Sequence, residues 1–474
     1  MAEEYDLVIL GAGTGGYVAA IRAAQYGLKV AIVEKDKLGG TCLHKGCIPS
    51  KALLRSAEVF ATVKRADDFG VSTSGVSLDF SKVQKRKETI IKQLYQGVKQ
   101  LMNKGKIDVF EGTGRILGPS IFSPTPGTVS VEMANGEENK MLIGQNVIIA
   151  TGSSARTIAG LDVDGSQILT SEEALELESL PTSMIIVGGG VIGIEWASML
   201  ADFGVDVTVL EAGPQILPTE DIDITREATK LLKKKGVQIM TSAKIDVDSL
   251  EKSEEHVSIT YEMNENKERI QADKLLLSVG RRANVKGIGL ENTDIEVEDG
   301  SIVVNEFYQT KESHIYAIGD VIGGLQLAHV ASHEGLIAVD HLARKKPTPI
   351  DYLSVPKCIY SHPEIASVGL TEEEAVEKGY KVKVGRFPFK GIGKALVFGE
   401  TDGFVKLIAN EENDDLLGIH MIGPHVTDMI SEAAIAKVLD AAHWEVAQTI
   451  HPHPTLSEII GEAALAVDGL AIHS

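Results

Sequence analysis

Two stretches of the chain repeat the same order of apolar and small residues. Residues 5–35 read YDLVILGAGTGGYVAAIRAAQYGLKVAIVEK, and residues 183–213 read SMIIVGGGVIGIEWASMLADFGVDVTVLEAG. Each begins with a short apolar run typical of a buried parallel strand. A glycine-rich turn follows, then a helical segment with small residues on one face, then a second strand that ends in an acid. The repetition predicts two βαβ units in one chain.

The two units correspond position by position, with an offset of 188 − 11 = 177 residues. Each has the spacing G-x-G-x-x-G and an acid 23 residues after the first glycine, since 34 − 11 and 211 − 188 both equal 23. The first glycine allows a tight turn, the second lets the backbone approach a pyrophosphate, and the third lets helix pack on strand. The residues concerned are Gly11, Gly13, Gly16 and Glu34 in one unit, and Gly188, Gly190, Gly193 and Glu211 in the other.

Both units are therefore predicted to bind a dinucleotide, with its pyrophosphate at a helix N-terminus and its ribose hydroxyls on the acid. The acid at Glu211 would also repel a 2′-phosphate, which favours NAD over NADP at the second unit. The alternative is a pair of tight turns without a ligand. It is disfavoured because the glycine spacing and the acid occur together twice.

Composition and charge exclude several other classes of protein. The 43% of hydrophobic and 24% of charged residues are ordinary for a globular chain, and 474 residues suggest about three domains. With 46 Lys and Arg against 67 Asp and Glu, the net charge of −21 disfavours nucleic acid as a partner. No apolar run approaches the roughly 18–20 residues of a bilayer span, and the start, MAEEYDLVIL, lacks the basic segment of a signal or transit peptide. We expect a cytoplasmic protein without a membrane partner.

The fold predicted from these patterns is α/β, with two Rossmann-like dinucleotide-binding domains and a C-terminal α+β domain. Residues 142–154 read as a strand that enters a Gly/Ser turn, and IYAIGD at 315–320 as a strand that returns to the first sheet. The first domain is then discontinuous. The predicted domains are 1–154 (first nucleotide domain, with two cysteines), 155–274 (second nucleotide domain), 275–346 (second segment of the first) and 347–474 (C-terminal domain).

Two of the three cysteines lie close together in GGTCLHKGCIPSK, residues 39–51. So few cysteines exclude a disulfide-stapled secreted domain, and the lack of a second pair disfavours a zinc site. A disulfide needs Cα atoms about 4.4–6.8 Å apart, whereas five residues of ideal helix rise about 7.5 Å. A Cys42–Cys47 bridge thus requires a distorted segment, which Gly46 allows. Since so short a loop would stabilise little, a reversible redox role is favoured over a stabilising disulfide. The predicted nucleotide site beside the pair favours that role over two buried inert thiols.

Thiol exchange also needs a base, because only the thiolate attacks and the leaving thiolate must be protonated. The segment HPHPTLSE at 451–458 offers two histidines. A turn at Pro454 could bring His453 to Glu458, whose carboxylate would hold the imidazole as a base. On the residues alone His451 is an equal candidate. A structural turn with solvated histidines is the alternative.

Taken together, the motifs resemble those of the flavoprotein disulfide reductases, from about residue 5 to residue 465. The motifs are GGTCLHKGCIPSK, ATG at 150–152, GVIGIE at 190–195, IGD at 318–320 and HPTLSE at 453–458. Within the family, GGTC…GCIPSK, LAH at 327–329 and HPTLSE are similar to members that oxidise protein-bound dihydrolipoyl groups with NAD in 2-oxo acid dehydrogenase complexes. One departure is His44-Lys45, where Asn-Val-Gly-like residues are common. A lysine there could lower a thiol pKa.

The resemblance implies a division of roles. FAD is expected at the first unit, with Glu34 on its ribose, and NAD at the second. Cys42 is expected to react with the substrate and Cys47 to pass electrons to the flavin, as a redox-active disulfide. The histidine before Pro-Thr is the family's base, which selects His453 over His451.

The resemblance also implies further site residues. Lys51 matches a lysine near the flavin ring, and Glu195 matches its acidic partner. The other expected FAD contacts are Gly114, Thr151, Gly152, Ser153, Asp320, Gln326, Leu327, Ala328 and His329. The other expected NAD contacts are Ile245 and Gly280.

Partners are implied by the same resemblance. It indicates a homodimer formed by the C-terminal domain, with the base supplied by the partner subunit, and docking on a lipoylated acyltransferase (E2). Because this chain is acidic, we expect the protein to dock on a basic segment of that acyltransferase. Two alternatives remain open: another NAD(P)H-dependent flavoprotein disulfide or quinone reductase, and a redox sensor or scaffold without turnover. The intact second glycine motif argues against the scaffold.

Overall fold

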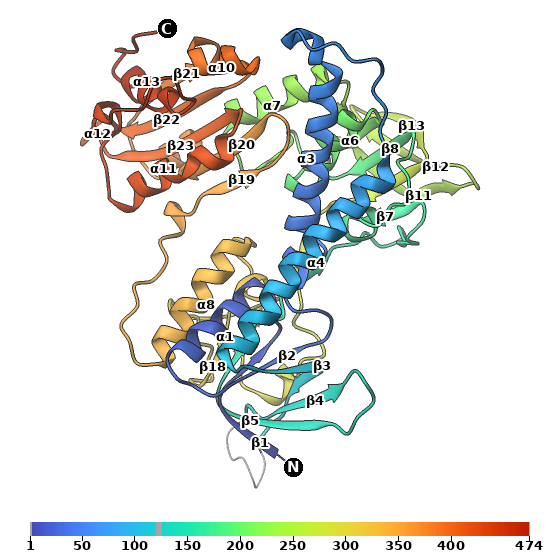
Figure 1. The fold of residues 1–474 in the computed structure, drawn as a ribbon, viewed down its shortest axis with the longest axis vertical. Coiled ribbons are helices and arrows are strands. Elements are labelled where there is room, and N and C mark those ends of the chain that lie inside the picture. Colours follow the sequence, from blue (N-terminus) through green and yellow to red (C-terminus); the bar gives the residue numbers. More distant parts are fainter. Residues whose placement is uncertain (1, 120–125, 474) are drawn as a thin grey trace. The chain divides into compact units, whose positions relative to one another are not determined.

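The computed structural model describes residues 2–119 and 126–473. The chain divides into two compact units, which are described separately (Figure 1). Unit 1 comprises Met1–Ala52, Ser81–Arg156 and Gly280–Ile350, and unit 2 comprises Leu53–Phe80, Thr157–Val279 and Asp351–Ser474.

Unit 1 is built on a parallel sheet in the order β3-β2-β1-β5-β18, while β4 joins β3 to β5 in antiparallel fashion. The second half of the central strand β1, LVIL, is buried on both faces of the sheet, which is why all four of its side chains are apolar. In β1, Leu7 and Ile9 lie in one core and Val8 and Leu10 in the other, following the strand period of two. The strands are β1 (Ala2–Leu10), β2 (Val30–Glu34), β3 (Asp108–Ile116), β4 (Val129–Met133), β5 (Lys140–Ile149) and β18 (Ile315–Ala317).

The predicted return of the chain to the first sheet is confirmed, because β18 pairs with β5. Helices α1 and α8 lie side by side in Figure 1. They approach through glycines: a Cβ on Gly335 would lie 2.8 Å from the Gly15 carbonyl oxygen. The helices of unit 1 are α1 (Thr14–Gln25), α2 (Gly40–His44) and α8 (Ala328–Leu342), with the start of α3 (Cys47–Lys64) and most of α4 (Phe80–Gly105).

Unit 2 contains a second parallel sheet, in the order β10-β9-β8-β14-β7. Between the last two strands of this sheet along the chain, β11, β12 and β13 form a separate three-stranded antiparallel sheet. The strands are β7 (Ile168–Thr170), β8 (Ser183–Val187), β9 (Asp206–Leu210), β10 (Gln238–Met240), β11 (Lys244–Lys252), β12 (Val257–Met263), β13 (Asn266–Ala272) and β14 (Lys274–Leu277). The main helices are α6 (Val191–Phe203) and α7 (Ile222–Lys234).

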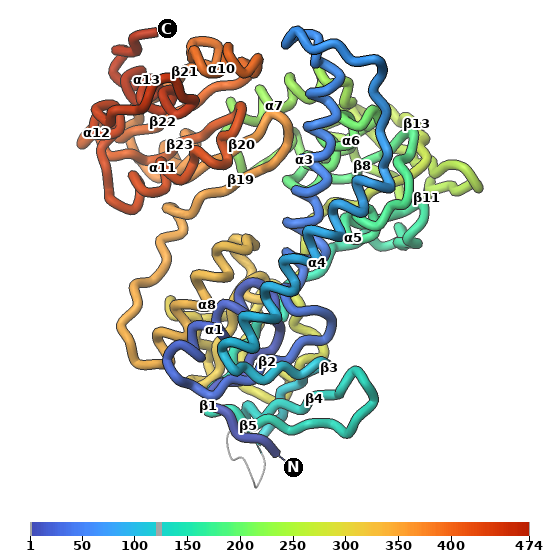
Figure 2. Tube along the Cα trace, viewed as in Figure 1, coloured from blue at the N-terminus to red at the C-terminus, as the bar shows by residue number. Residues whose placement is uncertain are grey.

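The C-terminal part of unit 2 is an antiparallel sheet in the order β19-β20-β23-β22-β21, with helices packed on it (Figure 2). Val405, Leu407 and Met421 share one core with residues of α11 and α13. The strands are β19 (Lys357–Ile359), β20 (Glu364–Gly369), β21 (Val382–Pro388), β22 (Phe404–Asn410) and β23 (Leu416–Gly423), and the helices are α9 (Glu372–Glu377), α11 (Val426–Val438), α12 (His443–Gln448) and α13 (Glu458–Ala466).

The predicted α/β class is thus confirmed, with two dinucleotide-type sheets and a C-terminal α+β part. Among the residues that the structure describes, no helix combines the length and the apolar character that a membrane crossing demands.

Candidate redox and dinucleotide-binding sites

The first glycine turn connects β1 to α1. Gly11 has φ 99°, and a Cβ there would lie 2.3 Å from the Ala150 carbonyl oxygen. A Cβ on Gly16 would lie 2.0 Å from the Gly11 carbonyl oxygen, so no side chain fits at either position. Among the described residues outside its own stretch of chain, none has an atom within 4 Å of the Cβ position of Gly13. Packing therefore requires the first and third glycines, whereas the second borders open space.

The second turn, between β8 and α6, has the same geometry. Gly188 has φ 108°, and its Cβ would lie 2.5 Å from the Ser278 carbonyl oxygen. A Cβ on Gly193 would lie 2.1 Å from the Gly188 carbonyl oxygen, and Gly190 again has no atom within 4 Å. The repetition read from the sequence is therefore also a repetition of backbone geometry.

Both nucleotide-type helices begin without a side-chain cap. Their N-caps are Gly13 and Gly190, and neither helix has an acid in its first turn. Helix α9, in contrast, has a complete capping box formed by Thr371 and Glu374. The first backbone N–H groups of α1 and α6 are thus left to an anionic ligand, as in phosphate-binding βαβ turns. The open second glycines and uncapped helices fit the pyrophosphates of FAD and NAD.

The two acids lie against these turns. Glu34 accepts hydrogen bonds from the backbone N–H of Ala12 (2.7 Å) and of Asp36 (2.8 Å). Glu211 accepts one from the backbone N–H of Gly189 at 2.6 Å. Two carboxylate oxygens offer about four lone pairs, so each acid retains acceptor capacity for a ribose hydroxyl. The ribose contacts stay a prediction.

A polar cluster holds the ATG turn that comes after β5. The Thr151 hydroxyl donates a hydrogen bond to the backbone carbonyl oxygen of Asn284 (2.9 Å). In return, the side-chain amide of Asn284 donates to the backbone carbonyl oxygen of Thr151 (3.0 Å). Ser153 donates to Asp320, and the Arg281 guanidinium donates to the Ser153 hydroxyl at 2.7 Å. Three predicted FAD contacts are thus joined by Arg281 and Asn284, which the sequence did not reveal as site residues. The only signal was their place in GRRAN, after a strand-terminal glycine.

The other expected cofactor contacts are spread over several elements. A Cβ on Gly114, in β3, would lie 2.5 Å from the Cδ2 of the Leu10 side chain, which would have to shift. Residues 326–329 lie at the start of α8. Ile245 lies on β11, and Gly280 has φ 106° at the start of the last segment of unit 1. Their nucleotide contacts stay predictions.

The cysteine segment is distorted as expected, because α2 ends at His44 and α3 begins only at Cys47. The thiol side chains of Cys42 and Cys47 are hydrogen-bonded to each other. This hydrogen bond, followed by burial and the charge of Cys47, raises the pKa of Cys42. The Thr14 hydroxyl and the charge of Lys51 act in the opposite direction, since both stabilise a Cys42 thiolate.

Close backbone contacts seat this segment on the first glycine turn. Gly39 donates its backbone N–H to the Ala12 carbonyl at 2.8 Å. Gly40 has φ 58°, and a Cβ there would lie 2.6 Å from the Gly13 Cα. The redox cysteines are therefore positioned by the same turn that is predicted to bind FAD.

The departure His44-Lys45 serves as an anchor. The His44 Nε2 lies 2.9 Å from the Leu38 carbonyl oxygen. The His44 ring packs edge-on against the Tyr95 ring, with 5.4 Å between the ring centroids. The Lys45 ammonium lies 2.7 Å from the Asp36 carboxylate. The positive charge that partly offsets the rise in the Cys42 pKa comes instead from Lys51. We therefore attribute to Lys45 a role in holding the loop.

The structure separates the two candidate bases. The His453 Nδ1 lies 2.9 Å from a Glu458 carboxylate oxygen, and the other oxygen accepts from the Thr455 backbone N–H at 2.9 Å. Burial would raise the pKa of Glu458, but these hydrogen bonds outweigh it and the pKa is lowered. The His451 Nε2 is bonded to Glu432 at 2.6 Å, and the His451 side chain is 8% exposed against 78% for His453. Of these two candidates, it is His453 that presents its ring to solvent while a carboxylate orients it.

Lys51 and Glu195 belong to different units, and their pairing stays a prediction. Glu195 is buried on α6, where it accepts the Tyr360 backbone N–H at 2.9 Å. No cluster of three His, Cys, Asp or Glu residues suited to a metal ion occurs within residues 2–119 and 126–473.

Comparison with known proteins identifies close relatives. The model of the pyridine nucleotide-disulphide oxidoreductases matches residues 5–335, and the dimerisation-domain model of the same group matches residues 355–464. A dihydrolipoyl dehydrogenase of Bacillus subtilis (strain 168) is 68% identical, and one of Zymomonas mobilis 42%; each alignment covers 100% of both chains. The crystal structure of LpdA from Mycobacterium tuberculosis has a TM-score of 0.89 at 27% identity, covering 98% of this chain and 99% of that one.

Proposed function

The chain belongs to the pyridine nucleotide-disulphide oxidoreductase family, and we propose that within it the protein is a dihydrolipoyl dehydrogenase that uses FAD and NAD. One observation carries the proposal. A pair of hydrogen-bonded thiols lies directly on the glycine turn of one dinucleotide motif, in a chain that has a second, complete motif. Full-length identity of 68% to a dihydrolipoyl dehydrogenase supports this member of the family over other disulfide reductases.

The chemistry at the thiols is determined by the side chains present. His453, oriented by Glu458, takes a proton from one thiol of the substrate. The substrate thiolate attacks Cys42 of an oxidised Cys42–Cys47 pair, which releases Cys47 as a thiolate. The second substrate thiol then displaces Cys42 from the first substrate sulfur and passes its proton to the departing Cys42. His453 returns the first proton to the Cys47 thiolate, which leaves a cyclic lipoyl disulfide and an enzyme dithiol. The substrate is thereby oxidised and the enzyme reduced by two electrons. When bound, FAD supplies the electron transfer that reoxidises the dithiol at the expense of NAD.

Several groups of the chain favour this exchange. The charge of Lys51 and the Thr14 hydroxyl stabilise a thiolate at Cys42. Gly39 and Gly40 fix the cysteine segment to the turn, so that the thiols need little rearrangement between cycles. At the second motif, the N-terminus of α6 would bind the NAD pyrophosphate and Glu211 the adenosine ribose. A 2′-phosphate would meet the Glu211 carboxylate.

The assembly is part of the proposal. The match of the dimerisation-domain model supports a homodimer, and exposed apolar residues on the C-terminal domain, including Val438, Leu439 and Ile450, support burial of that surface. We propose that His453 acts on the cysteines of the partner subunit. We also propose a cytoplasmic enzyme that serves, as E3, a lipoylated acyltransferase of a 2-oxo acid dehydrogenase complex.

The test is reduction of NAD by free dihydrolipoamide, followed through the absorbance of NADH with the FAD-loaded protein. We expect NADH to form, with a much lower rate for NADP and none for Cys42→Ser. A flavin-loaded protein that forms no NADH from dihydrolipoamide, yet reduces another disulfide or a quinone with NADH, would instead be a different reductase of the family.

A further inference from the structure

The loop that joins β9 to α7, residues 211–221, begins as part of the second nucleotide turn. Glu211 accepts the Gly213 backbone N–H at 2.6 Å, and Leu217 donates its own backbone N–H to the Gly189 carbonyl at 2.8 Å. Leu217 is 1% exposed and takes a left-handed conformation, φ 50°. The first half of the loop is therefore tied to the glycine turn and to the acid expected at the NAD ribose.

The other end of the loop is tied to the C-terminal domain. The buried Glu220 accepts from the Ser367 hydroxyl of β20 at 2.7 Å. The Lys357 ammonium lies 3.5 Å from Glu220 and donates to the Thr219 carbonyl at 3.4 Å. Three consecutive loop residues, 219–221, thus contact side chains of the C-terminal sheet, because Asp221 bonds to Lys406.

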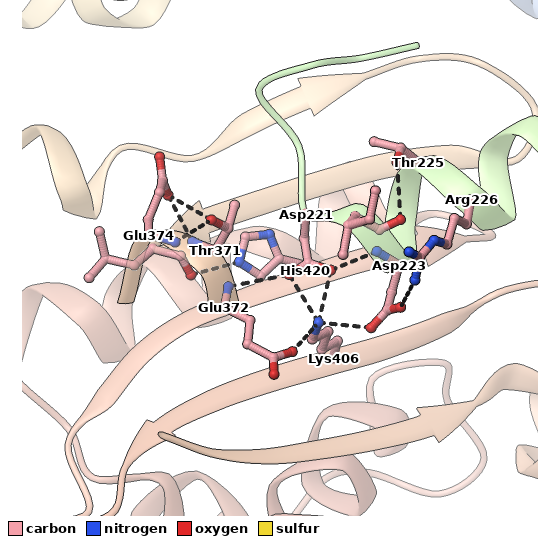
Figure 3. Close-up of polar contacts among 11 residues, drawn as sticks. Asp221, Asp223, Thr225, Arg226, Thr371, Glu372, Glu374, Lys406 and His420 are labelled. Atoms are coloured by element: carbon pink, nitrogen blue, oxygen red, sulfur yellow. Dashed lines mark hydrogen bonds and ion pairs between the residues drawn. The ribbon is translucent and has the colours of Figure 1, made fainter. Parts of the chain in front are cut away.

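Lys406 is the centre of a group of ion pairs that includes Asp221 (Figure 3). Its side chain is 1% exposed, and its ammonium lies 2.9 Å from Asp221, 2.8 Å from Asp223 and 2.7 Å from Glu372. On β22 its neighbours Val405 and Leu407 point into the helix-covered core, so Lys406 points to the opposite face of the sheet. Burial lowers the pKa of Lys406, but the three carboxylates outweigh it and raise the pKa. The ammonium is therefore charged. Separating it from the three carboxylates would leave buried charges without partners, which is strongly destabilising.

Asp221 joins the two ends of this connection. Besides binding Lys406 through both oxygens, it caps α7 by accepting the Asp223 backbone N–H at 3.0 Å. Next to Lys406, the cross-strand residue His420 is fully buried and hydrogen-bonded to the Leu370 carbonyl at 2.8 Å. Residues 211–221 are thus held by hydrogen bonds at both ends, to the glycine turn at one and to Lys406 at the other.

We propose that Lys406 is a positioning residue for the dinucleotide at the second motif, acting through residues 211–221 on the turn and on Glu211. The inference rests on the proposed binding of NAD there. It makes the C-terminal domain part of the nucleotide site as well as the dimerisation domain. Loss of the Lys406 charge releases Asp221, frees the loop end, and weakens nucleotide binding without touching the thiols.

The test compares Lys406→Met with Ser367→Ala, a milder change at the same loop end, and with Lys383→Met as a matched control. Lys383 lies on the neighbouring strand β21 and pairs with Asp414 (2.7 Å) and Asp468 (3.0 Å), far along the chain from residues 211–221. Each FAD-loaded variant is titrated with NADH and assayed for the KM of NAD. Each is also reduced anaerobically by dihydrolipoamide, a step that does not use NAD.

For Lys406→Met we expect the Kd of NADH and the KM of NAD to rise about tenfold, a usual size for coupling between two sites. Ser367→Ala should shift both in the same direction by less. Flavin reduction by dihydrolipoamide should keep the wild-type rate in both variants, and Lys383→Met should change none of these quantities.

The inference is overturned if folded Lys406→Met binds NADH as the wild type does, or if Lys383→Met weakens binding equally. It is also overturned if flavin reduction slows in step with NADH binding, since that would indicate general loosening. If Lys406→Met does not fold, an unchanged Kd in Ser367→Ala has the same meaning. Failure of the wild type to reduce NAD with dihydrolipoamide would refute the proposed function instead, and the NADH titration separates the two results.

Discussion

The two glycine turns have nearly the same backbone but different neighbours. At both, the first glycine is left-handed, the second borders open space and the third packs on the first. On the first turn lies the cysteine segment, with Gly40 against Gly13. On the second lies Leu217, from a loop that runs to the C-terminal domain. The two βαβ repeats therefore differ completely in the segment that comes after their second strand.

This difference teaches where the chemistry of a repeated βαβ unit is encoded. The turn and its acid supply a general dinucleotide site, and both copies retain it. The segment after β2 adds a thiol pair to the first copy. The segment after β9 instead connects the second copy to the C-terminal domain by hydrogen bonds and ion pairs. One copy is thus suited to redox exchange and the other to reversible nucleotide binding. Substitutions at the two turns should separate these roles, with effects that range from complete loss of turnover to a small change in one pKa.

Removing either thiol should have the largest effect, and only at the first turn. Cys42→Ser and Cys47→Ser should each abolish NAD reduction by dihydrolipoamide, because neither can form the internal disulfide. NADH binding at the second turn should be unchanged in a titration. If Cys47 is the thiol nearer the flavin, oxidised Cys42→Ser should have a long-wavelength charge-transfer band. A band in Cys47→Ser instead would reverse the assignment of the two thiols.

Removing the base should slow thiol exchange without stopping it. His453→Gln should lower turnover by ~10²–10⁴-fold, the usual contribution of a general base. Glu458→Gln should have a smaller effect, since it only orients the imidazole. Reduction of the flavin by NADH needs no such base and should keep its rate. Wild-type turnover of His453→Gln would place the base elsewhere, with His451 the next residue to test.

Exchanging the acids should affect the two turns differently. Glu211→Arg should weaken NAD binding by about 1–3 kcal/mol, because a charged hydrogen-bond acceptor is lost. It should strengthen NADP binding, because an arginine attracts the 2′-phosphate that the glutamate repels. The matched change Glu34→Arg should lower FAD content and leave the nucleotide preference unaltered. The two are compared by kinetics with both nucleotides and by flavin absorbance. Unchanged kinetics of Glu211→Arg would show that Glu211 is not at the ribose.

The smallest effect is expected at the ion pair beside the cysteines. The Lys45 and Asp36 side chains are 48% and 47% exposed, and such pairs contribute at most about 1 kcal/mol. Lys45→Ala should leave the Cys42 pKa unchanged, whereas Lys51→Met should raise it, because a positive charge that stabilises the thiolate is lost. The pH dependence of thiol alkylation in the reduced enzyme measures both. An equal rise in the two variants would show that Lys45 acts on the thiol.

Much of this arrangement was predictable because it depends on local spacing. The glycine positions of both turns, the break between Cys42 and Cys47, and the meeting of His453 with Glu458 all depend on residues within one short segment. The return of β18 to the first sheet was predictable from a buried strand that ends in Gly-Asp. Local patterns are informative because backbone geometry restricts which residues fit.

Contacts between distant segments could not be predicted in the same way. Arg281 meets Ser153 across 128 positions, and Lys406 meets Asp221 across 185. A single lysine in an apolar strand gives no sign of its partners. The sequence also left His451 and His453 equivalent, and only the resemblance chose between them. The structure distinguishes them by burial and by the carboxylate each one contacts.

The central claim is that the first turn holds FAD and the second holds NAD. The most direct test is flavin content and NADH binding in the matched variants Gly13→Val and Gly190→Val. Neither glycine has an atom within 4 Å of its Cβ position, so a valine would block the ligand while the fold is kept. Gly13→Val should be purified folded but without FAD. Gly190→Val should retain FAD and be reduced by dihydrolipoamide, yet bind no NADH. Loss of FAD from Gly190→Val, or full NADH binding by it, would contradict the account.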